Sequence, residues 1–230
     1  HVEDTTLEAI MLNLNGIVNL SKERILNELN KIISLNNFFK INENKKITKL
    51  FLLIFPELKH LNRLSKKNNF ENLEKFSKKL IYGILLIDKS NNFEYFCHKY
   101  KVGNKLKIEL NFISNLYKSY REDTDFFKKN IKKNVYLYGK ENLLELNTFL
   151  YFANRNMSDE KFTKIRDNIK NTTAPKFPFN GKYLISKGLR EGKEVGEVLN
   201  KLETDWINNN YSLSDENIDK KIKEAMSKYI

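Results

Sequence analysis

The sequence predicts an all-α fold, and three observations lead to this prediction. Apolar residues recur every three or four positions along nearly the whole chain of 230 residues, which is the spacing of one buried helix face. No segment shows the strict alternation of apolar and polar residues that is typical of a half-buried strand. Proline and glycine are scarce, with three and eight copies, so that long segments run without a helix breaker.

The first half of the chain contains helical patterns separated by polar turns. We expect a first helix over 7–14 with Asp4 or Thr5 as its cap, and a second helix that Ser21 caps. Residues 36–44 are expected to form a polar connection, and residues 66–71 a solvated loop. The other helices expected in this half cover 46–55, 73–85 and 93–100.

The second half continues the helical period. A long helix is expected over 105–120, and the stretch 126–133 that follows it is aromatic and basic. Ser158 and Ser212–Asp215 are expected to supply caps to the helices that follow them. The helices expected after residue 140 cover 141–152, 162–169, 182–187, 195–206 and 214–227.

The positive charge is concentrated in the middle of the chain. The formal net charge is +12. Residues 51–200 carry 29 basic and 17 acidic side chains, whereas 1–50 carry 7 and 6, and 201–230 carry 5 and 6. A broad positive field favours a polyanionic partner, either nucleic acid or an acidic membrane surface. A general abundance of Lys explains much of the count but not the nearly neutral ends.

Several functional classes are excluded by what the sequence contains. A single cysteine, Cys97, allows neither an internal disulfide nor a CxxC metal site, and it favours a reducing compartment. The longest apolar run, 50–56, is too short to span a bilayer. Asp123-Thr124-Asp125 lacks the rigid strand that a metal-binding Asp-x-Asp needs, and we expect it to begin a helix. Gly188–Lys193 is one residue short of a phosphate-binding loop, so we expect no catalytic or metal site in this chain.

The stretch from Pro175 to Gly196 concentrates the turn-forming residues. Two of the prolines and four of the glycines fall within it, which predicts two short helices in a fixed arrangement, with Gly188 ending the first. Backbone N–H groups at a helix start attract phosphate oxygens, and nearby cations add to this attraction. We call Lys182, Lys187, Arg190 and Lys193 the clamp cations and predict that they contact RNA phosphates, as do Lys132 and Lys133. The alternative is a helical hairpin whose glycines only permit close packing.

Aromatic residues beside lysines allow two interpretations. Phe126, Phe127, Tyr136 and Tyr138 could stack on unpaired bases. At helical spacing, however, such rings more often belong to a core, and we favour that interpretation.

Three segments together resemble one known family. Near the start, VEDTTLEAI followed by LSKERILNELNKII is similar to the neck helices of the CCA-adding tRNA nucleotidyltransferases and the related poly(A) polymerases; the matching residues include Glu23, Arg24, Glu28 and Lys31. Phe55-Pro56-Glu57-Leu58 is similar to a motif of the family's body. FPFNGKYLISKGLREGKEVG, with Trp206 after it, resembles the tail pattern Phe-Pro-x-x-Gly-x-Asp-Leu, although Tyr183 replaces the Asp.

This resemblance implies an all-α array of class II type with a neck over 1–36, a body over 37–105 and a tail over 106–230. It implies that the chain holds tRNA while a catalytic head adds C, C and A to the 3′ end from CTP and ATP with Mg²⁺. The head motifs do not occur in this sequence. We therefore expect the chain to be a piece of that enzyme that is inactive alone and binds no cofactor itself. The four neck residues would be structural.

We expect the chain in the cytoplasm or in an organellar matrix. Two alternatives to the CCA-adding function remain. A related poly(A) polymerase would add A to diverse RNA ends without a preference for tRNA. A basic helical interaction module would bind any polyanion without regard to its shape.

Overall fold

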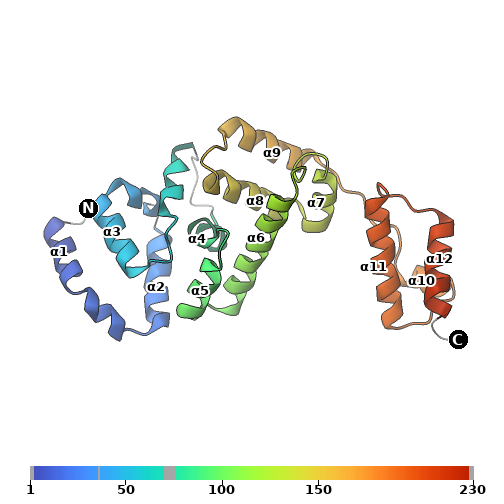
Figure 1. Cartoon of the computed structure of the whole chain (residues 1–230), viewed down its shortest axis with the longest axis horizontal. Helices are drawn as coiled ribbons and strands as arrows, with labels where there is room; N and C mark the ends of the chain where they lie inside the picture. The colour runs from blue at the N-terminus through green and yellow to red at the C-terminus, as the bar shows by residue number, and fades with distance from the viewer. Residues whose placement is uncertain (1–2, 36, 70–75, 228–230) are drawn as a thin grey trace. The chain divides into compact units, whose positions relative to one another are not determined.

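The computed structural model describes residues 3–35, 37–69 and 76–227, and in these residues the chain is all-α with no strand, as predicted. Figure 1 shows the helices in chain order. The α-helices are α1 (Asp4–Leu12), α2 (Lys22–Ile33), α3 (Lys45–Ile54), α4 (Lys78–Leu86), α5 (Asn92–Lys99), α6 (Asn104–Glu122), α7 (Ile131–Tyr138), α8 (Lys140–Ala153), α9 (Asp159–Asn171), α10 (Gly181–Ser186), α11 (Lys193–Asn208) and α12 (Asp215–Met226). Three 3₁₀ helices lie between them: η1 (Leu14–Asn19), η2 (Phe38–Glu43) and η3 (Leu61–Asn69).

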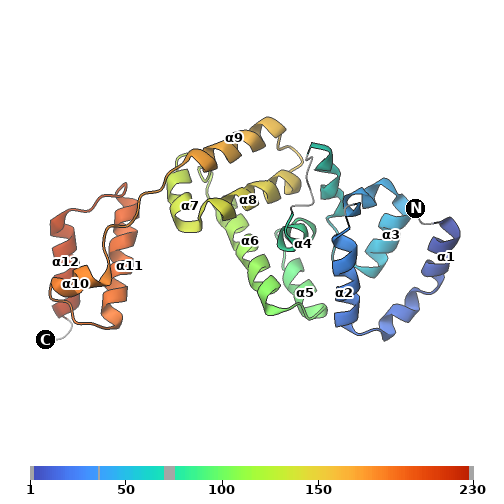
Figure 2. The same cartoon turned by 180° about the vertical axis from the view of Figure 1, so that it is seen from behind.

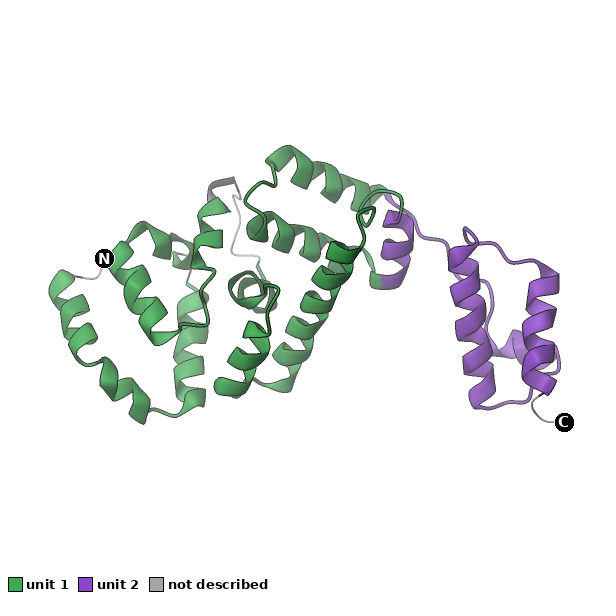
Figure 3. Ribbon diagram, viewed as in Figure 1, with its two compact units in different colours: residues 1–129, 138–171 green, residues 130–137, 172–230 purple. Residues whose placement is uncertain are grey.

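The chain forms two compact units (Figure 3). Unit 1 contains residues 1–129 and 138–171, and unit 2 contains 130–137 and 172–230. The chain therefore enters unit 2 for α7 and returns to unit 1 before it leaves at Thr172. This division follows packing contacts, so the expected neck, body and tail boundaries stay predictions.

Helix α4 is the centre of unit 1. Every residue from Leu80 to Leu86 is buried, as is typical of a helix surrounded by neighbours on all sides. It packs against η3, α5, α6 and α8, and the last three lie around it in both views (Figures 1 and 2). The Tyr82 ring packs at a tilt against Phe96 of α5 with ring centroids 5.5 Å apart, and α8 also contains buried aromatic rings.

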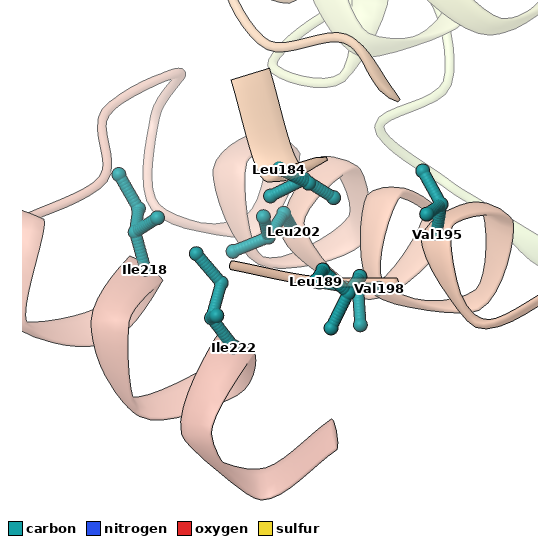
Figure 4. Packing of buried hydrophobic residues seen from close by; sticks show 7 residues of the cluster. All are labelled: Leu184, Leu189, Val195, Val198, Leu202, Ile218 and Ile222. Carbon is teal, nitrogen blue, oxygen red and sulfur yellow. The ribbon is translucent and has the colours of Figure 1, made fainter. Parts of the chain in front are cut away.

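Unit 2 has its own core, which Figure 4 shows. The short helix α10 and the pair α11 and α12 bury one apolar cluster: Leu184, Leu189, Val195, Val198, Leu202, Ile218 and Ile222. Trp206 extends this core, because the rings of Tyr136 and Phe177 lie 5.3 and 5.4 Å from it. The contact of Tyr136 brings α7 into this unit.

Several predicted caps are confirmed. The Ser21 hydroxyl accepts the backbone N–H of Arg24 at 3.2 Å, and Ser214 caps α12 in the same way at 3.3 Å. Gly188 has φ +100°, a left-handed conformation that favours glycine. The N–H groups of Gly188 and Leu189 donate to the carbonyls of Ile185 and Leu184, which is the Schellman motif, so α10 ends at the predicted glycine.

Four local predictions were wrong. Glu3, not Asp4 or Thr5, stands at the cap position of α1, without a side-chain hydrogen bond. Asp123 follows the end of α6, and its carboxylate accepts the N–H of Asp125 at 2.9 Å, so this segment turns and does not begin a helix. The connection over 36–44 is not polar throughout, because Phe38–Glu43 form η2 and bury Phe38 and Phe39. The structure also contains α7, for which no helix was predicted.

The fourth error concerns Lys66 in the expected loop 66–71. Residues 66–69 belong to η3, and the Lys66 ammonium donates to the backbone carbonyls of Asn154 and Met157 at 2.6 and 3.1 Å. This contact joins η3 to the turn after α8, over a separation in sequence that no local pattern reveals. Residues 70–71 and Leu73 of the expected helix 73–85 lie outside the described residues.

Candidate nucleic-acid interface

Helix α3 exposes a basic face beside a shallow groove of about 430 Å³. Asn44 caps the helix by accepting the N–H groups of Lys46 and Ile47. Lys45 and Lys49 lie one turn apart on the groove side, followed by the half-buried Leu52. The groove is lined by Asn42, Lys45, Thr48, Lys49, Leu52 and Leu53.

The polar residues of this groove hold it in shape, and its two lysines have no carboxylate partner in the described parts of the chain. Asn42 donates to the carbonyl of Leu61 at 2.5 Å, and the Thr48 hydroxyl donates to the carbonyl of Ile41 at 2.7 Å. Within the described part of the chain, neither Lys45 nor Lys49 has a carboxylate within 4.0 Å. Lys46, by contrast, pairs with Asp4 at 2.8 Å. Two unpaired ammonium groups on a fixed helix face can bind phosphate oxygens.

The predicted neck residues lie on α2, and three of them form exposed ion pairs. Glu23 pairs with Lys101, just after α5, at 3.0 Å, and Glu28 pairs with Lys31 at 2.8 Å. A backbone hydrogen bond and the Lys101 ammonium lower the pKa of Glu23. Arg24 is exposed. The Glu23–Lys101 contact connects α2 to the α5–α6 turn, and the structural role predicted for all four residues stays a prediction.

Glu57 carries a buried carboxylate. In the sequence, this residue was noted only as part of the Phe-Pro-Glu-Leu motif. Its side chain is 5% exposed. Lys99 Nζ lies 2.6 Å from Oε1, and the Tyr100 hydroxyl donates to Oε2 at 3.2 Å. The side-chain amide of Asn92 also donates to the Glu57 backbone carbonyl at 2.9 Å. The Phe-Pro-Glu-Leu motif therefore fastens the segment after α3 to α5.

A second group of hydrogen bonds joins His60, just before η3, to the turn after α4. His60 Nε2 lies 3.0 Å from Asp88 Oδ2, and both the N–H and the hydroxyl of Ser90 donate to Oδ1. Burial alone would raise the pKa of Asp88, but hydrogen bonds from Ser90, His60 and Lys59 outweigh it and hold that pKa well below its ordinary value. Burial also lowers the pKa of His60 below its ordinary value.

These shifts predict acid sensitivity. Because both folded-state pKa values are depressed, the stability they contribute is present above the unfolded values of about 6.5 and 3.9 and is lost as pH falls below them. We expect Asp88→Asn to lower the free energy of unfolding by about 2 kcal/mol at pH 7. The difference from the wild type should shrink below about pH 4, as urea unfolding at a series of pH values would measure. An unchanged difference at pH 3 would contradict this assignment.

The structure brings the clamp cations into unit 2, and two of them form ion pairs with carboxylates. Lys187 follows α10 and lies 3.7 Å from Asp219, and Lys193 begins α11 and lies 3.8 Å from Glu197. Lys182 is exposed in the first turn of α10, and Arg190 is exposed in the turn before α11. Exposed pairs of this length are weak, so a phosphate can replace the carboxylate. The RNA contacts predicted for the clamp cations stay predictions.

The other predicted RNA contacts lie on α7. Lys132 Nζ lies 4.7 Å from the centre of the Tyr211 ring, and Lys133 is exposed. Tyr136, from the next turn of α7, donates its hydroxyl hydrogen to Glu203. Burial and this carboxylate raise the pKa of Tyr136 to about 12. The interactions of α7 with Tyr211 and Glu203 show where it attaches within unit 2.

The aromatic residues beside the lysines include core residues, as we favoured. Phe126 and Phe127 are 2% and 7% exposed, so neither can stack on a base. Tyr136 and Tyr138 are half-buried. Cys97 is also buried, and burial raises the pKa of its thiol to about 11. Across residues 3–35, 37–69 and 76–227, no group of three or more His, Cys, Asp or Glu side chains is arranged to hold a metal ion.

The comparison with protein families agrees with the sequence resemblance at a coarse level. Residues 1–61 match a family model described as the probable RNA and SrmB-binding site of polymerase A. The match includes α1, α2, α3 and the groove with Lys45 and Lys49, which sequence reasoning did not select. It supports an RNA-binding role of the polymerase A kind for this segment. No curated protein matches the chain significantly, and no helix in the described ranges has the length and hydropathy needed to cross a membrane.

Proposed function

We propose that this chain holds tRNA for a nucleotidyltransferase that adds C, C and A to the tRNA 3′ end. The observation that carries the proposal is the match of residues 1–61 to an RNA-binding region, together with Lys45 and Lys49 inside that region, which form no ion pair among the residues that the structure describes. The tail motif in unit 2 and the net charge of +12 support it. Nucleotide transfer from CTP and ATP with Mg²⁺ is assigned to a separate catalytic head, which is the second proposed partner.

A poly(A) polymerase is the second candidate, because the matching family model names polymerase A. The two functions differ in the RNA that must be held. A CCA-adding enzyme recognises the folded shape of tRNA, whereas a poly(A) polymerase accepts diverse RNA ends. The tail resemblance through Phe177, Pro178 and Gly181 favours the first.

A binding competition at two salt concentrations separates these candidates. Labelled tRNA that lacks its CCA end is bound to the whole chain and then challenged with folded tRNA or with unstructured RNA of equal length. We expect folded tRNA to compete much better at both salt concentrations. Equal competition by the two RNAs would remove the tRNA assignment, and equal competition by heparin would leave only a basic helical module.

The clamp cations give a more local prediction. We expect the triple variant Lys182→Glu, Arg190→Glu and Lys193→Glu to weaken tRNA binding at least tenfold. Each lost phosphate contact reduces by about one the slope with which the logarithm of the binding constant falls against that of the salt concentration. Filter binding at about 0.1 M salt would measure this. Unchanged affinity in a variant with wild-type helix content would exclude the clamp as an RNA contact.

A further inference from the structure

A second groove lies in unit 1, outside the segment that matches the family model. It has a volume of about 570 Å³, which is within the range of ligand-binding clefts. One wall is a face of α9 with Lys161, Lys164 and Asn168, and the other is the end of α6 and the turn after it, with Tyr120, Thr124 and Lys128. The Asn168 amide donates to the carbonyl of Phe127 at 3.2 Å, which joins the two walls.

Three ammonium groups line this groove, and none of them forms an ion pair with a carboxylate in the described ranges of the chain. Lys161 and Lys164 are one turn apart on α9, and Lys128 lies opposite in the turn; all three are exposed. Among the residues that the structure describes, none of the three has a carboxylate within 4.0 Å. Two of the nearby carboxylates have other partners: Asp125 pairs with Lys129 at 3.8 Å, and Asp159 accepts the Tyr151 hydroxyl at 2.5 Å.

The rest of the lining suits a nucleotide better than a bare anion. Tyr120 is half-buried against the rings of Phe126 and Phe127, with centroids 5.8 and 5.6 Å away. Burial raises its pKa, so the phenol stays a neutral hydrogen-bond donor at pH 7. The Thr124 hydroxyl lies in the same groove. An aromatic ring with adjacent donors and cations is the combination that binds single-stranded nucleic acid.

We propose that this groove binds a single-stranded segment of RNA, with Lys128, Lys161 and Lys164 on its phosphates and Tyr120 beside a base or ribose. The proposal rests on the proposed function, because the groove and the matching segment 1–61 belong to the same compact unit. It extends the RNA path beyond that segment. A free nucleoside triphosphate presents the same phosphate chemistry, and the experiment separates it from an RNA strand.

The test compares two double variants of the whole chain with equal charge. Lys161→Gln with Lys164→Gln alters the groove. The control, Lys118→Gln with Lys170→Gln, alters one exposed lysine on each helix that borders the groove. Lys118 lies two positions from Tyr120 on α6, and Lys170 lies two positions from Asn168 on α9, so each is about 200° around its helix from a groove residue. Binding of a labelled single-stranded RNA is measured by fluorescence anisotropy at several salt concentrations. Far-ultraviolet circular dichroism confirms that both variants fold.

We expect the groove variant to lose about 25-fold in affinity at 0.1 M salt, and its salt slope to fall by about 1.4, because each single-strand phosphate contact contributes about 0.7. The control variant should change much less. Equal losses in both variants would show a generic charge effect and overturn the groove site. Displacement of RNA by metal-free ATP from the wild type, but not from the groove variant, would reassign the groove to a mononucleotide. If the wild type binds no RNA, the proposed function fails as well, whereas binding that ignores Lys161 and Lys164 overturns only the groove.

Discussion

Replacing Glu57 with Ala should lower the free energy of unfolding by about 3 kcal/mol, the scale for removing one partner of a buried ion pair. The carboxylate is 5% exposed and receives both Lys99 and the Tyr100 hydroxyl. Without it, two polar groups at the α3–α5 junction lose their acceptor in a site that water enters poorly. Urea unfolding of the whole chain, followed by circular dichroism, measures the change.

Two further variants make this result specific. Glu57→Gln keeps an acceptor for Tyr100 but loses the charge, so we expect an intermediate loss. Glu28→Ala removes the exposed partner of Lys31 and should change stability by less than about 0.5 kcal/mol. If Glu57→Ala unfolds at the same urea concentration as Glu28→Ala, the buried network does not stabilise the junction.

Reversing the charge of Lys45 and Lys49 should weaken tRNA binding by about 60-fold at 0.1 M salt. Each duplex phosphate that a cation neutralises contributes about 0.9 to the salt slope, which is about eightfold at this concentration, and two contacts multiply. The introduced Glu side chains would add repulsion. Both lysines are exposed on α3 and unpaired in the described structure, so the variant Lys45→Glu with Lys49→Glu should fold normally. Anisotropy of labelled tRNA measures the affinity.

The matched control lies on α12. Lys220 and Lys223 are also exposed, and no carboxylate of the described chain lies within 4.0 Å of them. They fall in the last thirty residues, whose charge is nearly balanced. Lys220→Glu with Lys223→Glu makes the same change in net charge and should cost far less affinity. If both double variants lose affinity equally, α3 has no special role in the interface.

The parts of the fold that local chemistry determines were predictable. Helices α2 and α12 begin after Ser21 and Ser214, whose hydroxyls accept a backbone N–H of the first turn. Helix α10 ends before Gly188, whose own N–H donates to a carbonyl of the last turn. Helix α7 was not predicted, because its aromatic and β-branched residues have modest helix propensity and its contacts are with Trp206 and Tyr211, distant in sequence. Long-range contacts also determine the role of Lys66.

The candidate site was predictable to a smaller extent. The motif around Glu23 pointed to an RNA-binding family, which the match of residues 1–61 supports. The lysines of the two grooves were missed, although Lys45 and Lys49, like Lys161 and Lys164, have the spacing of one helix face. In a chain with 41 basic residues, such pairs of lysines are too common for their spacing to identify a binding site. Only the fold shows which lysines meet in a concave surface without carboxylate partners.

The salt dependence of tRNA binding by the whole chain tests RNA binding most directly. The affinity would be measured between 50 and 300 mM monovalent salt. Because Lys45 and Lys49 are proposed to neutralise two phosphates, the logarithm of the binding constant should fall with that of the salt concentration with a slope of about −2 or steeper. Absence of binding at the lowest salt concentration, or a slope near zero, would contradict an RNA-holding function for this chain.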